Sequence, residues 1–115
     1  MATREAKLIA YLSEKTGLPV SNTKEAGRTS EEYILVQRTN GSRVNKIDSR
    51  TYAIQSISSI SKLRAAKIDE TVVEAMELYE NEPYISKCGL NSDYDFTDAN
   101  TKEFRYQSVY DIVYF

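Results

Sequence analysis

The stretch that decides the fold is residues 104–115, FRYQSVYDIVYF, which has the aromatic and β-branched composition of a strand and is apolar on both sides. Successive side chains of a strand point to opposite faces. One face therefore carries Tyr106, Tyr110, Ile112 and Tyr114, and the other carries Val109, Val113 and Phe115. We expect the first face to pack on the protein's own helices. The second also needs cover, which a small domain has little material to supply, so the sequence predicts a partner.

Length and composition indicate one soluble domain, residues 1–115. A chain of 115 residues has the common size of a single domain. Its 41% hydrophobic and 28% charged residues are close to the average of globular proteins. No apolar run is long enough to cross a membrane, and the charged N-terminus does not resemble a signal peptide. We therefore expect a soluble protein that is made in the cytosol and has no membrane partner.

Residue counts argue against most catalytic machinery. There is one cysteine, Cys88, and no histidine, which excludes an intrachain disulfide, a Cys/His zinc site and a Ser-His-Asp triad. The net charge of -2 argues against a general affinity for nucleic acid. We expect a protein that is not an enzyme and that uses no cofactor.

The remaining segments predict helices and strands in a definite order. Residues 4–16 have helical spacing, with Thr3 as N-cap and Gly17 as C-cap. A polar loop follows, with room for a short edge strand near Val20. Further segments are expected as strands at 33–38 and 51–57, a helix at 59–80, a strand at 84–90 and the closing strand. The order α-β-β-α-β-β predicts an α+β fold, a four-stranded and mainly antiparallel sheet with two helices on one face.

Charge is distributed unevenly between two expected loops. The connection at 39–50 and its flank hold four basic residues against one acid, Asp48, and the acidic loop near the C-terminus holds four acids against Lys102. Contact between a basic loop and the next subunit's acidic loop would run head to tail and could close a ring. Two solvated loops are an equally good interpretation. The residues are Arg38, Arg43, Lys46 and Arg50 in the first loop and Asp93, Asp95, Asp98 and Glu103 in the second.

The second helix carries its charges in the order that the helix dipole disfavours, basic first and acidic last. Glu70, Glu74 and Glu77 lie along one side, where like charges repel. This arrangement indicates a basic neighbour, although a solvated face explains it more simply.

Two further features could indicate a function, but each also has a simpler structural explanation. The acids at 93, 95 and 98 could hold a hard cation, but they do not follow an EF-hand loop and a plain acidic turn is the simpler interpretation. Nine tyrosines and no tryptophan suit a surface that becomes buried on assembly. Tyr106 and Tyr110 are candidates for such a surface, or ordinary core residues.

A family resemblance rests on four short motifs: QRTNGSR at 37–43, YAIQ at 52–55, YDF at 94–96 followed by Asp98, and RYQSVYDI at 105–112. In this order, over about residues 18–115, the chain resembles the tail terminator or tail completion proteins of long-tailed bacteriophages. The serine-rich run at 56–61 departs from that pattern and puts the inner surface of a ring in question.

The resemblance implies a structural protein of the virion. Such proteins form a hexameric ring that caps the tail tube, stops its polymerisation and joins it to the head connector, while DNA only passes through. Assembly would take place in the host cytoplasm. The implied contacts with other subunits or with the tube are Arg38, Arg43, Arg50, Asp95 and Asp98, with Lys46 in the same loop. The alternative is a small ferredoxin-like module that binds a ligand or peptide on its sheet, and an enzyme is the third choice.

Overall fold

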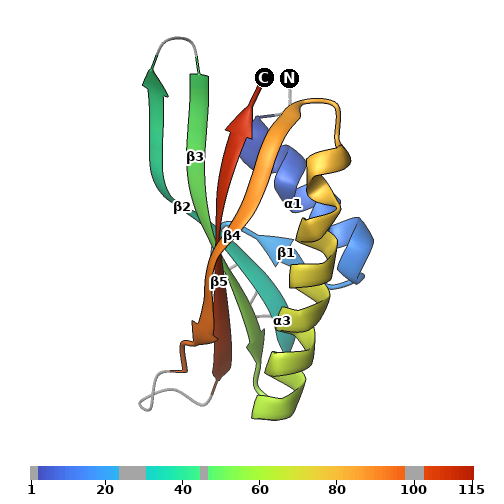
Figure 1. Cartoon of the computed structure of the whole chain (residues 1–115). Helices are drawn as coiled ribbons and strands as arrows, with labels where there is room; N and C mark the ends of the chain where they lie inside the picture. The colour runs from blue at the N-terminus through green and yellow to red at the C-terminus, as the bar shows by residue number, and fades with distance from the viewer. Residues whose placement is uncertain (1–2, 24–30, 45–46, 98–102) are drawn as a thin grey trace.

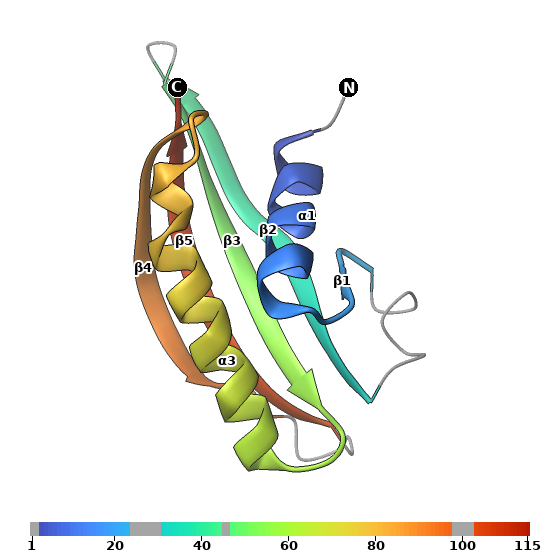
Figure 2. The ribbon, with the colours of Figure 1, turned by 90° about the vertical axis from the view of Figure 1, so that its right-hand side faces the viewer.

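The computed structural model describes residues 3–23, 31–44, 47–97 and 103–115. Both helices lie on one face of a strongly twisted sheet (Figures 1 and 2). The sheet has five strands in the order β1-β2-β3-β5-β4. The elements are α1 (Arg4–Thr16), β1 (Val20–Ser21), β2 (Glu32–Val44), β3 (Ile47–Ser58), α3 (Lys62–Glu77), a 3-10 turn (Tyr79–Asn81), β4 (Ile85–Asp95) and β5 (Phe104–Tyr114).

The first helix forms as its end signals predict. The Thr3 side chain accepts a hydrogen bond from the Ala6 amide, which satisfies one of the free N–H groups of the first turn. Gly17 ends the helix in the left-handed conformation, with φ of 70°, and its amide donates to the Ser13 carbonyl.

The second helix is shorter than the predicted 59–80. It begins at Lys62 because the Ser61 hydroxyl accepts from the Arg64 amide and so acts as N-cap. It ends at Glu77, and the chain continues as a 3-10 turn over Tyr79–Asn81. The predicted helix was therefore three residues too long at each end, since residues 59–61 and 78–80 lie outside the regular helix.

The prediction of a long loop at 39–50 was wrong. β2 and β3 continue as a paired ribbon to Val44 and Ile47, and Lys46 falls in the short segment outside the described residues. In Figure 1 this ribbon projects at one end of the molecule. Its residues are polar because the ribbon extends beyond the helices, and polar composition alone does not separate a loop from a solvated hairpin.

The sheet differs from the predicted one by one strand and by its mixed direction. The chain leaves α1 through Leu18 and pairs Val20 and Ser21 in parallel with β2. The Pro19 carbonyl accepts from the Ile34 amide at 2.9 Å and fixes this register. The α+β class and the two helices are as predicted, whereas the sheet has five strands, of which one pair is parallel.

The main core fills the space between the helices and one sheet face. β5 contributes alternate residues, and β2 and β3 contribute residues of the same face, so the covered side is almost continuous apolar surface. Within the described ranges, no helix is both long and apolar enough to cross a bilayer. The largest fully buried residues of this core are Leu8, Leu12, Ile34, Tyr52, Ile54, Met76, Tyr79, Tyr110 and Ile112.

Candidate subunit interface

The two faces of β5 have different surroundings. Tyr110, 2% exposed, lies in the core beneath the helices together with Ile112 and Tyr114. Val109 and Val113 point to the opposite face, where they are half-buried, and the neighbouring Phe115 is 81% exposed. Within the part of the chain that the structure describes, neither helix covers that face (Figure 2).

The far end of this second face is closed by its own side chains. Tyr33, Leu35 and Ile57 form a small buried cluster separate from the main core. Beside them the Gln55 amide donates to the Gln107 side-chain oxygen at 3.2 Å, and the Gln107 amide donates to the hydroxyl of Tyr94. The face is therefore closed near Ile57 and open near Val113, toward the projecting hairpin.

An arginine cluster occupies the helix-facing side of the hairpin. The Asp48 carboxylate lies 2.5 Å from Arg4, 3.3 Å from Arg50 and 3.6 Å from Arg43. The guanidinium carbon of Arg4 also lies 4.5 Å from the ring centre of Tyr114, a cation–π distance. Asp48 is only 7% exposed, so its charge is compensated in a partly desolvated site.

A β-bulge adds Arg38 to this side. The register of β2 against β3 shifts between Arg38 and Asn40, so Gly41 pairs with Arg50 and Arg43 pairs with Asp48. Without the extra residue, Arg38 and Arg43 would face opposite sides of the ribbon. The Arg38 guanidinium lies over Gly41, 3.7 Å from where a Cβ would be. A hollow of about 200 Å³ opens between these residues.

Charge dominates the chemistry of this cluster. Burial raises the pKa of Asp48, but hydrogen bonds from Arg50 and the charges of Arg4 and Arg43 outweigh it and hold the pKa below the usual range of a carboxyl. Asp48 is therefore ionised at neutral pH. Counting Arg38, four guanidinium groups surround one carboxylate, which leaves a balance of +3.

The predicted acidic turn binds within its own chain. The Asp95 carboxylate lies 2.5 Å from the Lys62 amine and accepts from the Thr97 amide at 2.9 Å. The hydrogen bond from Lys62 is the main reason that the pKa of Asp95 falls to about 2. Asp98 lies outside the described residues. Asp95 is thus already paired, which lowers the charge that this turn could offer to a second subunit.

The acidic surface without such a cation is on α3. Glu70, Glu74 and Glu77 on α3 and Glu80 in the 3-10 turn that follows, here called the glutamate row, are all exposed. Within the described ranges none of them makes an ion pair. A groove of about 70 Å³ lies next to the row, lined in part by Val73, Cys88 and Leu90.

The buried Asp69 on α3 contacts Asp93, which is exposed on β4. Asp69 is 4% exposed, and its Oδ1 has no hydrogen-bond partner. Burial, the contact with Asp93 and the charge of Glu70 raise the pKa of Asp69 to about 8. In the described residues no three His, Cys, Asp or Glu side chains are arranged to hold a metal ion. Asp69 is therefore largely protonated at neutral pH and can donate a hydrogen bond to Asp93.

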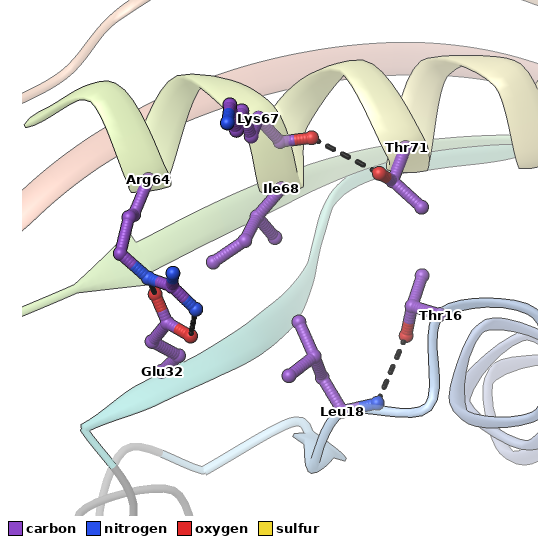
Figure 3. A pocket seen from close by; sticks show the side chains of 7 residues that line it. All are labelled: Thr16, Leu18, Glu32, Arg64, Lys67, Ile68 and Thr71. Atoms are coloured by element: carbon purple, nitrogen blue, oxygen red, sulfur yellow. Dashed lines mark hydrogen bonds and ion pairs between the residues drawn. The ribbon is translucent and has the colours of Figure 1, made fainter.

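A pocket between the helices offers little to a polar ligand. It holds about 150 Å³ between the end of α1, the start of β2 and α3. Figure 3 shows the Glu32 and Arg64 side chains turned toward one another, and their N···O distances are 2.5 and 2.7 Å. The Thr71 hydroxyl donates to the Lys67 carbonyl and the Leu18 amide donates to Thr16, so most polar groups of the pocket bind each other.

The structure brings only part of the predicted interface together. Arg38, Arg43 and Arg50 form one cluster, and Asp95 lies elsewhere beside Lys62. Tyr110 belongs to the core, and Tyr106 is half-buried on the same sheet face. Sequence analysis missed Arg4, since nothing local joins it to residues 44 positions later.

No protein-family model matches the chain, and no curated protein matches its sequence.

Proposed function

We propose that this chain is a structural subunit that forms a ring on the end of the tail tube of a long-tailed bacteriophage. The ring would stop tube polymerisation and join the tail to the head connector, with DNA passing through it. Its place would be the head–tail interface of the virion, after assembly in the host cytoplasm. The expected number of copies is about six, from the family resemblance.

The observation that carries the proposal is the one-sided cover of β5. Val109 and Val113 lie half-buried on a face over which no described helix packs, and Phe115 is exposed at its end. Exposed apolar surface of this kind marks interaction sites in soluble proteins. Copies that shield each other would bury it. The motifs shared with tail terminator proteins point to the same kind of assembly.

Chemistry within the described residues supports a structural role over an enzymatic one. Burial raises the pKa of the Cys88 thiol to about 12, so the reactive thiolate is scarce at neutral pH. Asp69 lies on the buried side of α3, where its carboxyl has little access to solvent or to a substrate.

The test is assembly of the purified protein, alone and with tail tubes. We expect rings in electron micrographs, and a mass of several copies by light scattering. Phe115→Ala should weaken association because it removes the most exposed apolar side chain of the uncovered face. Leu63→Ala is the matched control, since Leu63 is exposed on α3, away from that face. A monomer at every concentration, with no binding to tubes, would contradict the proposal.

A further inference from the structure

Two charged surfaces of the described chain are complementary to each other and lie on different parts of the molecule. The arginine cluster occupies the projecting end of the β2–β3 hairpin, and the glutamate row follows the side of α3 (Figure 1). A contact that places the arginine cluster of one copy on the glutamate row of the next brings opposite charges together and, repeated head to tail, can close a ring.

The arginine cluster has more guanidinium hydrogen-bond donors than the Asp48 carboxylate can bind. Arg43 keeps 68% of its side chain exposed and reaches Asp48 only at 3.6 Å. Arg38 is exposed and makes no ion pair within the described ranges. Because Arg4 and Arg50 already satisfy much of the Asp48 carboxylate, the guanidinium groups of Arg38 and Arg43 remain available to external carboxylates.

The glutamate row, in turn, lacks cationic partners within the described residues. Glu70, Glu74 and Glu77 repeat at four and three residues, so they line one side of α3 and repel one another. They span about 10 Å along the helix axis. Arg38 and Arg43 are five positions apart on β2, about 15 Å in an extended strand, and the bulge between them shortens this distance. Two arginine side chains can therefore reach both ends of this set of carboxylates.

Apolar surface beside the row suits arginine side chains. Leu78, one helical turn after Glu74, and Leu90, on the adjacent β4, are both exposed. An arginine stem can cover such surface while its head binds a carboxylate. Lysine lacks the planar fork that pairs with a carboxylate through two hydrogen bonds.

We propose that the arginine cluster of one copy docks on the glutamate row of a second copy. The contact joins Arg38 and Arg43 to the carboxylates of Glu70, Glu74 and Glu77, beside Leu78 and Leu90. It rests on the proposed function, because it names the surfaces through which ring subunits meet. It replaces the acidic turn at Asp95, which is paired with Lys62 in its own chain.

The test uses charge reversal of each surface in the full chain. The hairpin variant carries Arg38→Glu and Arg43→Glu, and the row variant carries Glu74→Arg and Glu77→Arg. Each variant alone should associate at least about tenfold more weakly than the wild type, because its two surfaces now carry like charge. Sedimentation at low and high salt measures association, and circular dichroism and melting check that each variant folds.

A mixture of the hairpin variant and the row variant distinguishes the proposed contact from a general effect of charge on association. In an equimolar mixture the acidic hairpin of one variant faces the basic row of the other, and the remaining surfaces also have opposite signs. The mixture should therefore associate more tightly than either variant does alone. Combining all four substitutions in one chain should also restore association. Glu14→Arg with Lys15→Glu on the exposed side of α1 is the control and should change nothing.

The outcomes distinguish this inference from the proposed function. Rings that form normally in both variants would overturn the docking contact and leave the ring proposal intact. A wild-type chain that never associates, with or without tubes, would overturn both. Association that follows the charge pattern, without any binding to tubes, would support the contact alone. A hairpin variant that loses binding to duplex DNA and keeps wild-type self-association would assign the arginines to nucleic acid instead.

Discussion

Asp48 and Asp69 are both buried aspartates, and their surroundings leave Asp48 negatively charged and Asp69 largely neutral at neutral pH. Asp48, in the β2–β3 hairpin, has three arginines within 3.6 Å and a lowered pKa. Asp69, on the buried side of α3, has Asp93 as its neighbour and a pKa raised to about 8. One region of the molecule thus collects cations around a carboxylate, while the other collects carboxylates without a cation. Positive and negative charges therefore lie in separate regions of one copy, with an excess of arginines at the hairpin and an excess of carboxylates at α3.

The largest effect is expected from Asp48→Asn. The substitution keeps the shape of the side chain but removes the charge that holds Arg4, Arg43 and Arg50 together. Loss of one partner from a buried ion cluster leaves uncompensated charge, and partial solvent access lowers the cost here to about 2–3 kcal/mol of unfolding free energy. Urea denaturation of the purified protein measures it.

Glu14→Gln is the control for this change. It removes the same charge from an exposed position on α1 and should alter stability by less than about 0.5 kcal/mol. If Asp48→Asn were as mild as the control, the three arginines would not depend on Asp48, and the contrast with Asp69 would disappear.

A smaller effect, of opposite sign, is expected from Asp69→Asn. The neutral amide replaces a carboxyl that burial, Asp93 and Glu70 keep from ionising. At pH 9 the variant should be more stable than the wild type by about 1–2 kcal/mol. Near pH 3 the two should be similar, since Asp69 is then protonated in both the folded and the unfolded states.

The pH dependence follows from the sign of the shift. The raised pKa of Asp69 means that the folded protein holds a proton which the unfolded chain loses above about pH 4. Its contribution to stability is complete below that pH and declines as pH rises through about 8. The lowered pKa of Asp48 acts in reverse, and its contribution is lost as pH falls below about 4. A melting series that shows no loss of wild-type stability between pH 5 and 9 would contradict the assignment for Asp69.

The sequence correctly predicts the features of the fold that depend on residues close together in the chain. Thr3 and Gly17 fixed the ends of α1, and the alternation of residues 106–114 correctly assigned Tyr110 and Ile112 to the helix-covered face. The long hairpin was missed because its alternating polar residues resemble a loop. The register shift after Arg38, which brings two arginines to one side, has no local signature in the residues.

The partners of the two buried aspartates come from distant segments of the chain and could not be predicted from the sequence. Asp48 was visible as a single acid among bases, but Arg4 and Tyr114 approach it from the two ends of the chain. Asp69 could have been found, since it lies four residues after Ala65 and three before Val72, within the apolar stripe of α3. Its partner Asp93 comes from β4, and only the packing of helix on sheet unites the two carboxyls.

The smallest effect is expected from Glu74→Gln in the glutamate row. Glu74 lies four residues after Glu70 and three before Glu77, so neutralising it removes two repulsions within one copy. We expect a gain of about 0.2–0.5 kcal/mol in unfolding free energy at low salt, fading near 0.5 M salt as the charges are screened. Glu14→Gln again serves as control, since it has no acidic neighbour three or four positions away on α1. A loss of stability would mean that Glu74 already has a cationic partner within its own chain. The contrast between a hairpin with an excess of arginines and a row without a cation would then fail, and the row would have no reason to bind arginines of a second copy.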